Sequence, residues 1–587
     1  MRVTIRNVLL ATAGMGVLAT PAVAQNMIDD YEPVTAEMLS NPANGEWPIY
    51  RGNYQGWGYS ELSQITADNV GDLQLVWSRG LEPGANETTP LMHDGVIFIG
   101  QTNDVIQAID AATGSLIWEH RRSLPADEDF VNVVGQNKRS VALWDDKLYF
   151  ISADNYVVAL DAASGQVVFE SDRGVGLEVT NTNGPIVVEG VVVAGSSCQF
   201  SAFGCYATGH DAENGEELWR HNFIPRPGEE GDETWGDSPF ESRWMTGSWG
   251  AYTYSPDTGL VYYGSTGVGP AAEVQRGMEG ATLDGTNTRF AVDPATGEIV
   301  WSHQVLPRDN WDQECTYEAI IVESPINPNP DAVGMLAVGD VSGETRLVQT
   351  GVPCKTGLAW TFDAATGEFL WAKETVQQTL VESVADDGLV TINEDMIPGI
   401  GPDASIQMCP TFLGGKDWPP AAYDPNMNAF FVPLNNLCYS EYYANEDEPT
   451  PLDVYNVSST YMISPGEENI GRIDAISVET GDTLWTWETR DGLYSPVLAT
   501  AGGVLFTGGF DRYFRAIDSE SGELVWETRL ASTVDGHATT FEVDGRQYVA
   551  VTAGGALVGG AFGDTYSPNS DPVIGNNALY VFALPEN

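Results

Sequence analysis

A short motif recurs along the chain and limits its possible folds more than any other feature. The motif reads Ala-x-Asp-x-x-(Ser/Thr)-Gly-x-x-x-Trp, with small variations between copies. Its copies are AIDAATGSLIW (108–118), ALDAASGQVVF (159–169), GHDAENGEELW (209–219), AVDPATGEIVW (291–301), TFDAATGEFLW (361–371), AISVETGDTLW (475–485) and AIDSESGELVW (516–526). The stretch LQLVW, ending at Trp77, matches the last half of an eighth copy. Such repetition indicates a fold whose units pack on their neighbours.

Each copy predicts a β-hairpin. The Asp and Ser/Thr side chains bond their own backbone and close a tight turn, while the Gly supplies a positive φ. The flanking residues alternate as strand residues do. The closing Trp or Phe has a large face to bury, and these aromatics stand at 77, 118, 169, 219, 301, 371, 485 and 526.

A second type of hairpin, with two apolar strands around a turn, also recurs. We find it at 89–100, 140–152, 184–195, 250–265, 317–324 with 346–351, 421–434, 495–509 and 539–555. Pairing the two types gives eight four-stranded units, which predicts an all-β fold, an eight-bladed β-propeller with tryptophan-docking repeats. The last strand (578–585) is expected beside the Trp77 strand, where it closes the ring.

The predicted domain organisation is a signal peptide (1–24) followed by one propeller domain (25–587). The long gaps between closing aromatics predict loop insertions at about 222–249 and 372–420, built from loops and short helices. Insertions on one face of a repeat array often build a binding site.

The N-terminus has the pattern of a secretory signal. Arg2 and Arg6 precede an apolar stretch, and Ala22-Val23-Ala24 forms a small-residue cleavage site. We expect cleavage after Ala24 and a periplasmic location. No later stretch approaches about 18 uninterrupted apolar residues, so no membrane span is predicted.

The charge balance excludes whole classes of partner. The chain has 26 Lys and Arg against 83 Asp and Glu, for a formal net charge of −57. A polyanion such as nucleic acid is therefore no partner, and docking on anionic lipid is disfavoured. Solubility explains such acidity, and a cationic electron-transfer partner stays open.

Six cysteines in an exported protein predict disulfides. Sequence proximity favours the pairs 198–205 and 409–438, which leaves 315–354 among about 15 possible connectivities. The sequence contains no Cys-x-x-Cys-His, so no c-type haem attachment is predicted.

Beyond the repeat, long strings of the sequence resemble the quinoprotein alcohol dehydrogenases, and their sorbose dehydrogenase branch in particular. These strings are FIPRPGEEGDETWG (223–236), LPRDNWDQEC (306–315), GVPCKTG (351–357) and CPTFLGGKDWP (409–419). The resemblance implies a pyrroloquinoline quinone (PQQ) cofactor and a metal near the propeller axis. It also implies an alcohol or sugar substrate and an external electron acceptor, a soluble cytochrome c or similar.

The implied chemistry needs a base, a cation on the quinone oxygen and a flat floor for the cofactor. The resemblance assigns the base to Asp312, the cation to Lys355 and the floor to Trp249. Arg139 matches an arginine on a PQQ carboxylate. The remaining implied cofactor contacts are Glu87, Thr182, Ser197, Asp417 and Trp418. Asp417 departs from the family's usual Asn.

The metal site departs further from the family pattern. Ungapped alignment puts Phe200 where the family has Glu and Gly267 near the family's Asn. Glu314 stands two residues after Asp312, an offset at which lanthanide-using relatives carry an extra carboxylate. Oxygen ligands suit Ca²⁺, and its flexible coordination accepts Gln or Thr. We therefore expect Ca²⁺, with a lanthanide possible, at Asp312, Gln199, Thr266 and Glu314.

Three functions compete at this level. The leading one is a periplasmic PQQ-dependent dehydrogenase acting on sorbose-type sugars and polyols or on bulky secondary alcohols of the deoxynivalenol type. The alternative is a non-catalytic eight-bladed scaffold of envelope assembly, and a propeller hydrolase or lectin has less support. Aromatics in and beside the insertions either line a wide substrate mouth or form local core; they are Trp235, Phe240, Trp244 and Trp418.

Overall fold

The computed structural model describes residues 27–124, 137–174, 179–202, 204–334, 343–449, 455–555 and 575–586, with Thr565, Ser567 and Val573. For residues 198–202 it describes the backbone alone. The predicted signal peptide lies outside these residues. No helix among them is long and apolar enough to cross a membrane.

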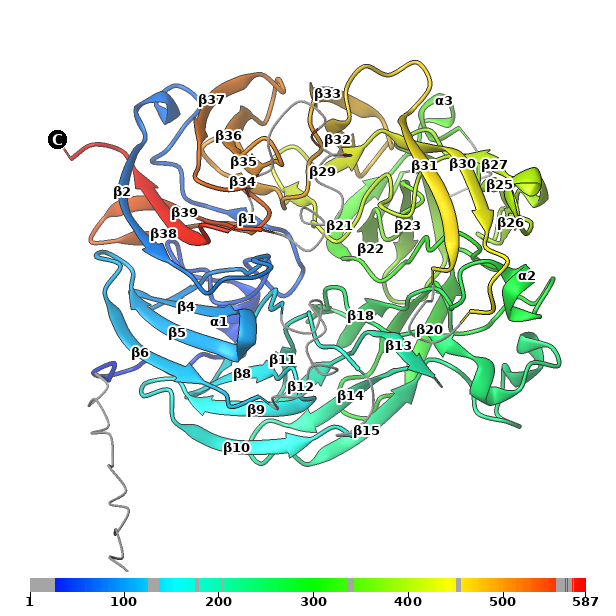
Figure 1. The fold of residues 1–587 in the computed structure, drawn as a ribbon. Coiled ribbons are helices and arrows are strands. Elements are labelled where there is room, and N and C mark those ends of the chain that lie inside the picture. The colour runs from blue at the N-terminus through cyan, green and yellow to red at the C-terminus, as the bar shows by residue number, and fades with distance from the viewer. Residues whose placement is uncertain are drawn as a thin grey trace, which may run out of the picture.

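Eight sheets of four or five strands follow one another around a ring, as the colour sequence in Figure 1 shows. The predicted all-β propeller is therefore confirmed. The first sheet contains β3 (Leu91–His93), β4 (Val96–Gln101), β5 (Val105–Asp110) and β6 (Leu116–Arg121), and the second contains β7 (Ala142–Trp144), β8 (Lys147–Ile151), β9 (Tyr156–Asp161) and β10 (Val167–Asp172). The third contains β11 (Ile186–Val188), β12 (Val191–Ala194), β14 (Tyr206–Asp211) and β15 (Glu217–Asn222), and the fourth contains β17 (Thr253–Ser255), β18 (Leu260–Gly264), β19 (Thr288–Val292) and β20 (Ile299–Gln304).

The chain continues around the ring with four more sheets. They are β21 (Ile320–Ile326), β22 (Glu344–Gly351), β23 (Leu358–Asp363) and β24 (Phe369–Glu374); β28 (Ala422–Asp424), β29 (Ala429–Asn435), β32 (Gly471–Ser477) and β33 (Thr483–Thr489); β34 (Leu498–Thr500), β35 (Val504–Gly508), β36 (Tyr513–Asp518) and β37 (Leu524–Arg529), joined by β1 (Tyr59–Ser60); and β38 (Ala538–Val543), β39 (Arg546–Ala553), β40 (Ala578–Ala583) and β2 (Gln74–Gly80).

The ring closes between the two ends of the chain. Strand β2, near the N-terminus, pairs antiparallel with the C-terminal β40, and Trp77 lies opposite Val581. Figure 1 shows the blue β2 beside the red C-terminal strands. The predicted closing pair is confirmed.

In most motifs the closing aromatic docks on the turn of the next motif. Trp118 is fully buried, and its Nε1 donates to the Ala162 carbonyl at 3.0 Å. Gly165 has φ +71°, and a Cβ added there would stand 2.5 Å from the Trp118 ring. The same close approach joins Trp77 to Gly114, Phe169 to Gly215, Trp219 to Gly297, Trp301 to Gly367 and Trp485 to Gly522. The motif glycine thus supplies both the turn and room for the neighbour's ring.

Both predicted insertions contain short helices but also strands that the sequence did not indicate. The first holds η5 (Asp232–Trp235), η6 (Phe240–Ser242) and β16 (Trp244–Met245), which pairs with β13 (Cys198–Ala202). The second holds β25 (Val381–Val384), β26 (Val390–Ile392), η7 (Glu394–Met396), η8 (Pro402–Ala404) and β27 (Ile406–Met408). Strand β27 joins β30 (Leu437–Ala444) and β31 (Val457–Ile463) in a separate small sheet. The insertion strands β16, β25, β26 and β27 are only two to four residues long, so their alternation is too brief to predict.

The remaining short elements lie in connections between sheets. They are α1 (Ala36–Ser40), η1 (Val70–Asp72), η2 (Thr102–Asp104), α2 (Glu273–Arg276) and α3 (Pro330–Val333). Two predicted disulfides, Cys315–Cys354 and Cys409–Cys438, are confirmed. The predicted Cys198–Cys205 pair includes Cys198, whose side chain lies outside the described part of the chain.

Candidate active site

Six of the predicted site residues share one topological position. They lie in the segments that lead into the first strand of a sheet, whereas Lys355 lies between β22 and β23. First strands such as β3 are buried, and fourth strands such as β6 are partly exposed. The inner ends of the sheets therefore bring distant parts of the chain together at the centre of the ring. Glu87 precedes β3, Arg139 precedes β7, Thr182 precedes β11, Trp249 precedes β17, Glu314 precedes β21 and Trp418 precedes β28.

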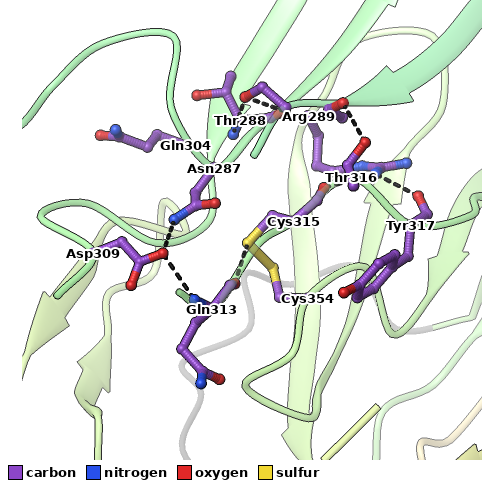
Figure 2. The surroundings of a disulfide bond; sticks show 12 residues. Asn287, Thr288, Arg289, Gln304, Asp309, Gln313, Cys315, Thr316, Tyr317 and Cys354 are labelled. Carbon is purple, nitrogen blue, oxygen red and sulfur yellow. Dashed lines mark hydrogen bonds between the residues drawn. A yellow bond between two sulfur atoms is a disulfide. The ribbon is translucent and has the colours of Figure 1, made fainter. Parts of the chain in front are cut away.

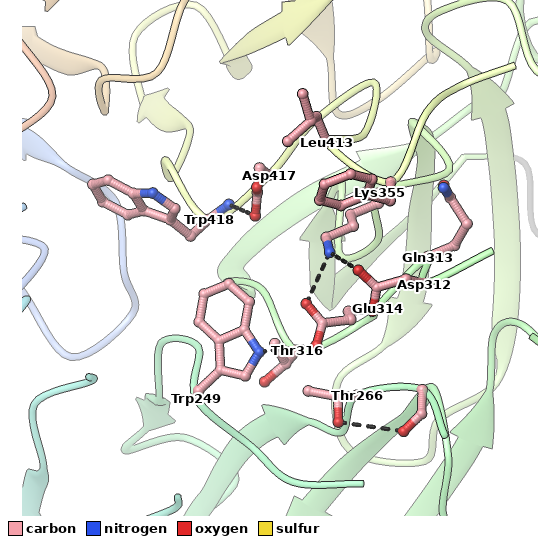
Figure 3. A network of polar contacts seen from close by, with 12 residues as sticks. Trp249, Thr266, Asp312, Gln313, Glu314, Thr316, Lys355, Leu413, Asp417 and Trp418 are labelled. Atoms are coloured by element: carbon pink, nitrogen blue, oxygen red, sulfur yellow. Dashed lines mark hydrogen bonds and ion pairs between the residues drawn. The ribbon is translucent and has the colours of Figure 1, made fainter. Parts of the chain in front are cut away.

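One polar cluster unites the predicted base and the predicted cation. Lys355 Nζ lies 2.7 Å from Asp312 Oδ2 and 3.0 Å from Glu314 Oε2. Trp249 Nε1 donates to Glu314 Oε1 at 3.2 Å. Figure 3 shows the ammonium between the two carboxylates, with Trp249 on the side of Glu314. The three charged side chains are buried.

The electrostatics of this cluster suit proton transfer. Burial raises the pKa of Asp312 well above its ordinary value, and the nearby Lys355 opposes that shift. Burial also raises the pKa of Glu314. For Lys355, burial alone lowers the pKa, but the two carboxylates outweigh it and hold the pKa well above its usual range. Within the described part of the chain, Asp312 Oδ1 is buried and accepts no hydrogen bond, so one oxygen of the predicted base can still accept a proton.

Trp249 also belongs to a second cluster, around Arg139. Arg139 Nη2 pairs with Glu87 Oε2 at 2.7 Å, and its Nη1 donates to Thr182 Oγ1 at 2.7 Å. Its guanidinium lies over the Trp249 ring at 4.7 Å and over the Trp418 ring at 4.9 Å. The structure thus brings five predicted cofactor residues into contact. Sequence reasoning missed Asn137, which donates to the same Glu87 oxygen.

Asp417 is held by two tyrosines that the sequence did not single out. Its Oδ1 accepts from Tyr317 Oη at 2.6 Å and from the Trp418 backbone N–H at 2.7 Å, while Oδ2 accepts from Tyr494 Oη at 2.7 Å. Tyr494 precedes β34, the first of the four consecutive strands β34 to β37 of its sheet. That shared position was the available signal for finding it.

The predicted metal ligands are only partly assembled. Thr266 Oγ1 accepts from the Gly247 N–H at 2.9 Å and donates weakly to the Gly267 carbonyl at 3.4 Å. The side chain of Gln199 lies outside the described residues. Within the described residues, no three His, Cys, Asp or Glu side chains group to hold a metal ion. Of these candidate ligands, Asp312 has a carboxylate oxygen, Oδ1, that is buried and has no hydrogen-bond partner among the described residues.

The remaining predicted residues are Ser197 and the aromatics of the first insertion. Their described contacts are backbone hydrogen bonds for Ser197 and contacts within the insertion for the aromatics. Ser197 exchanges backbone hydrogen bonds with Thr180 at 2.8 and 2.9 Å and is buried. Trp235 is fully buried in a small apolar cluster of the first insertion, with Phe240 packed against it. Trp244 donates its Nε1 to the Glu241 carbonyl at 3.0 Å. For Trp235 and Phe240 the local-core interpretation is therefore right, whereas Trp418 contacts the Arg139 cluster.

Known proteins share this arrangement of sheets over most of the chain. The family model described as "PQQ: Glucose/ethanol/alcohol dehydrogenase, beta-propeller domain" matches residues 47–382 and 493–549. The quinohemoprotein alcohol dehydrogenase ADH-IIG of Pseudomonas putida is 31% identical over 591 residues, covering 94% of this chain and 77% of the relative. The quinoprotein alcohol dehydrogenase PedH of Pseudomonas putida is 27% identical, covering 94% of this chain and 93% of the relative.

Solved structures agree in fold. The quinohemoprotein alcohol dehydrogenase from Comamonas testosteroni has a TM-score of 0.81 at 25% identity, covering 94% of this chain and 84% of that chain. A europium-containing methanol dehydrogenase has a TM-score of 0.82 at 23% identity, covering 92% of this chain and 98% of that chain. At that identity the second likeness concerns the fold alone.

Proposed function

Because this chain belongs to the PQQ-dependent alcohol dehydrogenase family of β-propellers, we propose that it oxidises an alcohol group of a sugar, a polyol or a bulky secondary alcohol. Sorbose-type and deoxynivalenol-type compounds are the candidate substrates. One observation carries the proposal. Asp312, in a buried cluster with Lys355, keeps one carboxylate oxygen that has no hydrogen-bond partner among the residues the structure describes.

The residues of the two clusters have separate roles in this proposal. When bound, PQQ supplies the acceptor for the hydride that leaves the alcohol carbon. Asp312 Oδ1 takes the hydroxyl proton, and Lys355 holds the other carboxylate oxygen in place. Arg139 and Lys355 face a flat, acidic ligand with charge-assisted hydrogen bonds, and Trp249 gives it a floor. Glu87 and Thr182 hold the Arg139 guanidinium in position.

Ca²⁺ is the proposed metal, with Asp312 as its anchoring ligand and Gln199, Thr266 or Glu314 completing the set; a lanthanide is the other candidate. The buried carboxylates of Asp312 and Glu314 share the Lys355 ammonium, and their remaining negative charge supports a cation there. Exhaustive chelation is expected to abolish activity and added Ca²⁺ to restore it. Full activity in a metal-free holoenzyme would remove the metal from the proposal.

The electrons need an acceptor outside this chain. The sequence has no Cys-x-x-Cys-His for haem attachment, and its net charge of −57 favours a cationic partner. We propose a soluble cytochrome c or a similar carrier. The predicted signal peptide supports a periplasmic location for this chain, so its electron carrier would have to be accessible there.

Reconstitution tests the function. The chain, produced without cofactor, is mixed with PQQ and Ca²⁺, and dye reduction is followed with sorbose, glucose, 1-propanol and deoxynivalenol. We expect turnover that needs both additions and that disappears in Asp312→Asn. Asp424→Asn is the matched control, because Asp424 is a buried carboxylate on β28 that accepts the Asn426 backbone N–H. A folded protein that neither binds PQQ nor reduces dye would favour the scaffold alternative instead.

A further inference from the structure

A covalent bond joins the two segments that carry the Asp312–Glu314–Lys355 cluster. Cys315 directly follows Glu314, and Cys354 directly precedes Lys355. The two cysteines form a disulfide across a sequence separation of 39 residues (Figure 2). One segment leads into β21, and the other connects β22 to β23. The disulfide therefore bridges the neighbours of the predicted base on one side and of the predicted cation on the other.

Backbone hydrogen bonds flank the disulfide and set the register of the two segments. The Lys355 N–H donates to the Glu314 carbonyl at 3.1 Å, and the Tyr317 N–H donates to the Pro353 carbonyl at 3.2 Å. Together with the disulfide, these bonds fix the Lys355 backbone beside that of Glu314. Arg289 adds support from outside by donating to the Cys315 carbonyl at 3.1 Å and the Tyr317 carbonyl at 2.6 Å.

The disulfide is buried in an apolar environment. Cys315 and Cys354 are fully buried, in one cluster with Trp311, Leu358 and residues of the second insertion. A position next to the reacting groups yet without access to solvent fits a structural constraint rather than a reactive thiol pair.

The cluster needs such a constraint for an electrostatic reason. Lysine carries its charge on a flexible stem of four carbons, so its ammonium stays on two carboxylates only if its backbone is held. Two buried carboxylates that lose their one ammonium would keep an uncompensated charge. Proximity effects in catalysis are steep, and a displacement of about 1 Å can cost about 100-fold in rate.

We propose that the Cys315–Cys354 disulfide positions a group for the reaction. It holds Lys355 Nζ within ion-pair distance of Asp312 and Glu314. The proposal rests on the function proposed above in assigning a reaction to this cluster. The two cysteines are positioning residues and touch no substrate in it.

The second disulfide supplies a matched control. Cys409–Cys438 is also buried and closes a comparable separation of 29 residues. Its neighbours Met408 and Leu437 are apolar core residues rather than members of the charged cluster. Removing either disulfide therefore costs a buried cross-link, but only Cys315–Cys354 joins the residues directly next to Glu314 and Lys355 in the chain.

The test compares Cys315→Ser/Cys354→Ser with Cys409→Ser/Cys438→Ser. The first measurement is dye-linked turnover of the holoenzymes. For the 315/354 variant we expect kcat to fall about 100-fold with KM little changed, whereas the 409/438 variant keeps kcat within about threefold. Both variants are expected to unfold at lower temperature, so the loss of stability does not distinguish them.

The second measurement needs neither cofactor nor turnover. Acetic anhydride labels exposed lysines in the protein without PQQ, and mass spectrometry quantifies acetylation of Lys355. We expect Lys355 to be protected in the wild type and in the 409/438 variant, and acetylated in the 315/354 variant. If the serine pair does not fold, Cys315→Ala/Cys354→Val keeps an apolar core and is measured in the same way.

The two measurements separate failure of this proposal from failure of the proposed function. Equal kcat values and equal Lys355 protection in both variants would overturn the positioning role. A wild type without PQQ-dependent turnover would overturn the function, yet the labelling result would still decide whether the disulfide holds Lys355.

Discussion

At the scale of single residues, the site depends on the backbone conformation of Asp312. Its φ of +61° lies in the left-handed region, which is uncommon for residues other than glycine. Asp309 holds the backbone on both sides of it. Asp309 Oδ1 accepts from the Trp311 N–H at 2.8 Å, and its Oδ2 accepts from the Gln313 N–H at 2.8 Å. Asn287 donates to the same Oδ2 at 2.9 Å (Figure 2).

Asp309→Asn tests this support. An amide has one acceptor oxygen, so one of the two backbone N–H groups loses its partner in a buried site. We expect a loss of about 1–3 kcal/mol in the free energy of unfolding, measured in urea, together with a lower kcat. Asp293→Asn is the control, because both described turn N–H groups, those of Ala295 and Thr296, bond to the same Asp293 oxygen. A kcat equal to that of the control variant would contradict the role of Asp309.

At the scale of elements, the propeller is held by contacts between neighbouring sheets. Trp118 at the end of one motif covers Gly165 in the turn of the next, and its indole N–H satisfies a turn carbonyl. Trp526 closes the last full copy and has no following copy to dock on. It is half-buried and packs edge-on to Phe514 and Phe582.

Trp118→Ala and Trp526→Ala should therefore differ. For Trp118→Ala we expect a loss of about 3–5 kcal/mol, because a fully buried ring and an inter-sheet hydrogen bond disappear. For Trp526→Ala the loss should be smaller, since part of that ring is already in contact with water. Denaturant unfolding of both variants measures the difference, and equal losses would contradict the docking argument.

A histidine at the end of β3 makes the stability of that element depend on pH. His93 Nε2 bonds the Glu32 carbonyl at 2.7 Å, which leaves Nδ1 facing the Glu46 carboxylate at 3.0 Å. Burial lowers the pKa of His93, but the bonds to Glu46 and Glu32 outweigh it and leave the pKa above 6.5. A raised folded-state pKa gives stability that is complete below the unfolded pKa and is lost as pH rises through the folded pKa.

His93→Gln should remove that contribution. We expect the wild type to have a larger unfolding free energy than the variant, and we expect this difference to be larger at about pH 5.5 than at about pH 8.5. Urea unfolding at both pH values gives the two differences. A difference that stays constant or widens with rising pH would show that the ion pair does not contribute.

At the scale of the whole molecule, the net charge of −57 acts against the compact state through self-repulsion. Salt screens charges separated by more than about 10 Å at 0.1 M ionic strength. We therefore expect Tm to rise when NaCl increases from about 0.02 to about 0.3 M, as measured by calorimetry. Sucrose at equal osmolality controls for non-ionic effects. A Tm that falls with NaCl would mean that attractive surface ion pairs outweigh the repulsion.

The repeat made the fold predictable because its interactions are local. The Asp, Thr and Gly of a turn lie within a few residues of the strands they join, so the sequence alone determined the hairpins, their number and the ring. The resemblance also predicted roles for Asp312 and Lys355, which stand in two of the long strings, and for Trp249 and Arg139, which stand outside them.

The contacts of the site were decided only by the tertiary structure, because they join segments far apart in the chain. Tyr494 reaches Asp417 across 77 positions, and Asn137 reaches Glu87 across 50. Nothing in the local pattern at either end indicates such a pair. Closing the ring places the inner ends of all the sheets around one centre, and that geometry selects which polar side chains meet. The sequence determined the blades, and their arrangement in the ring determined the site.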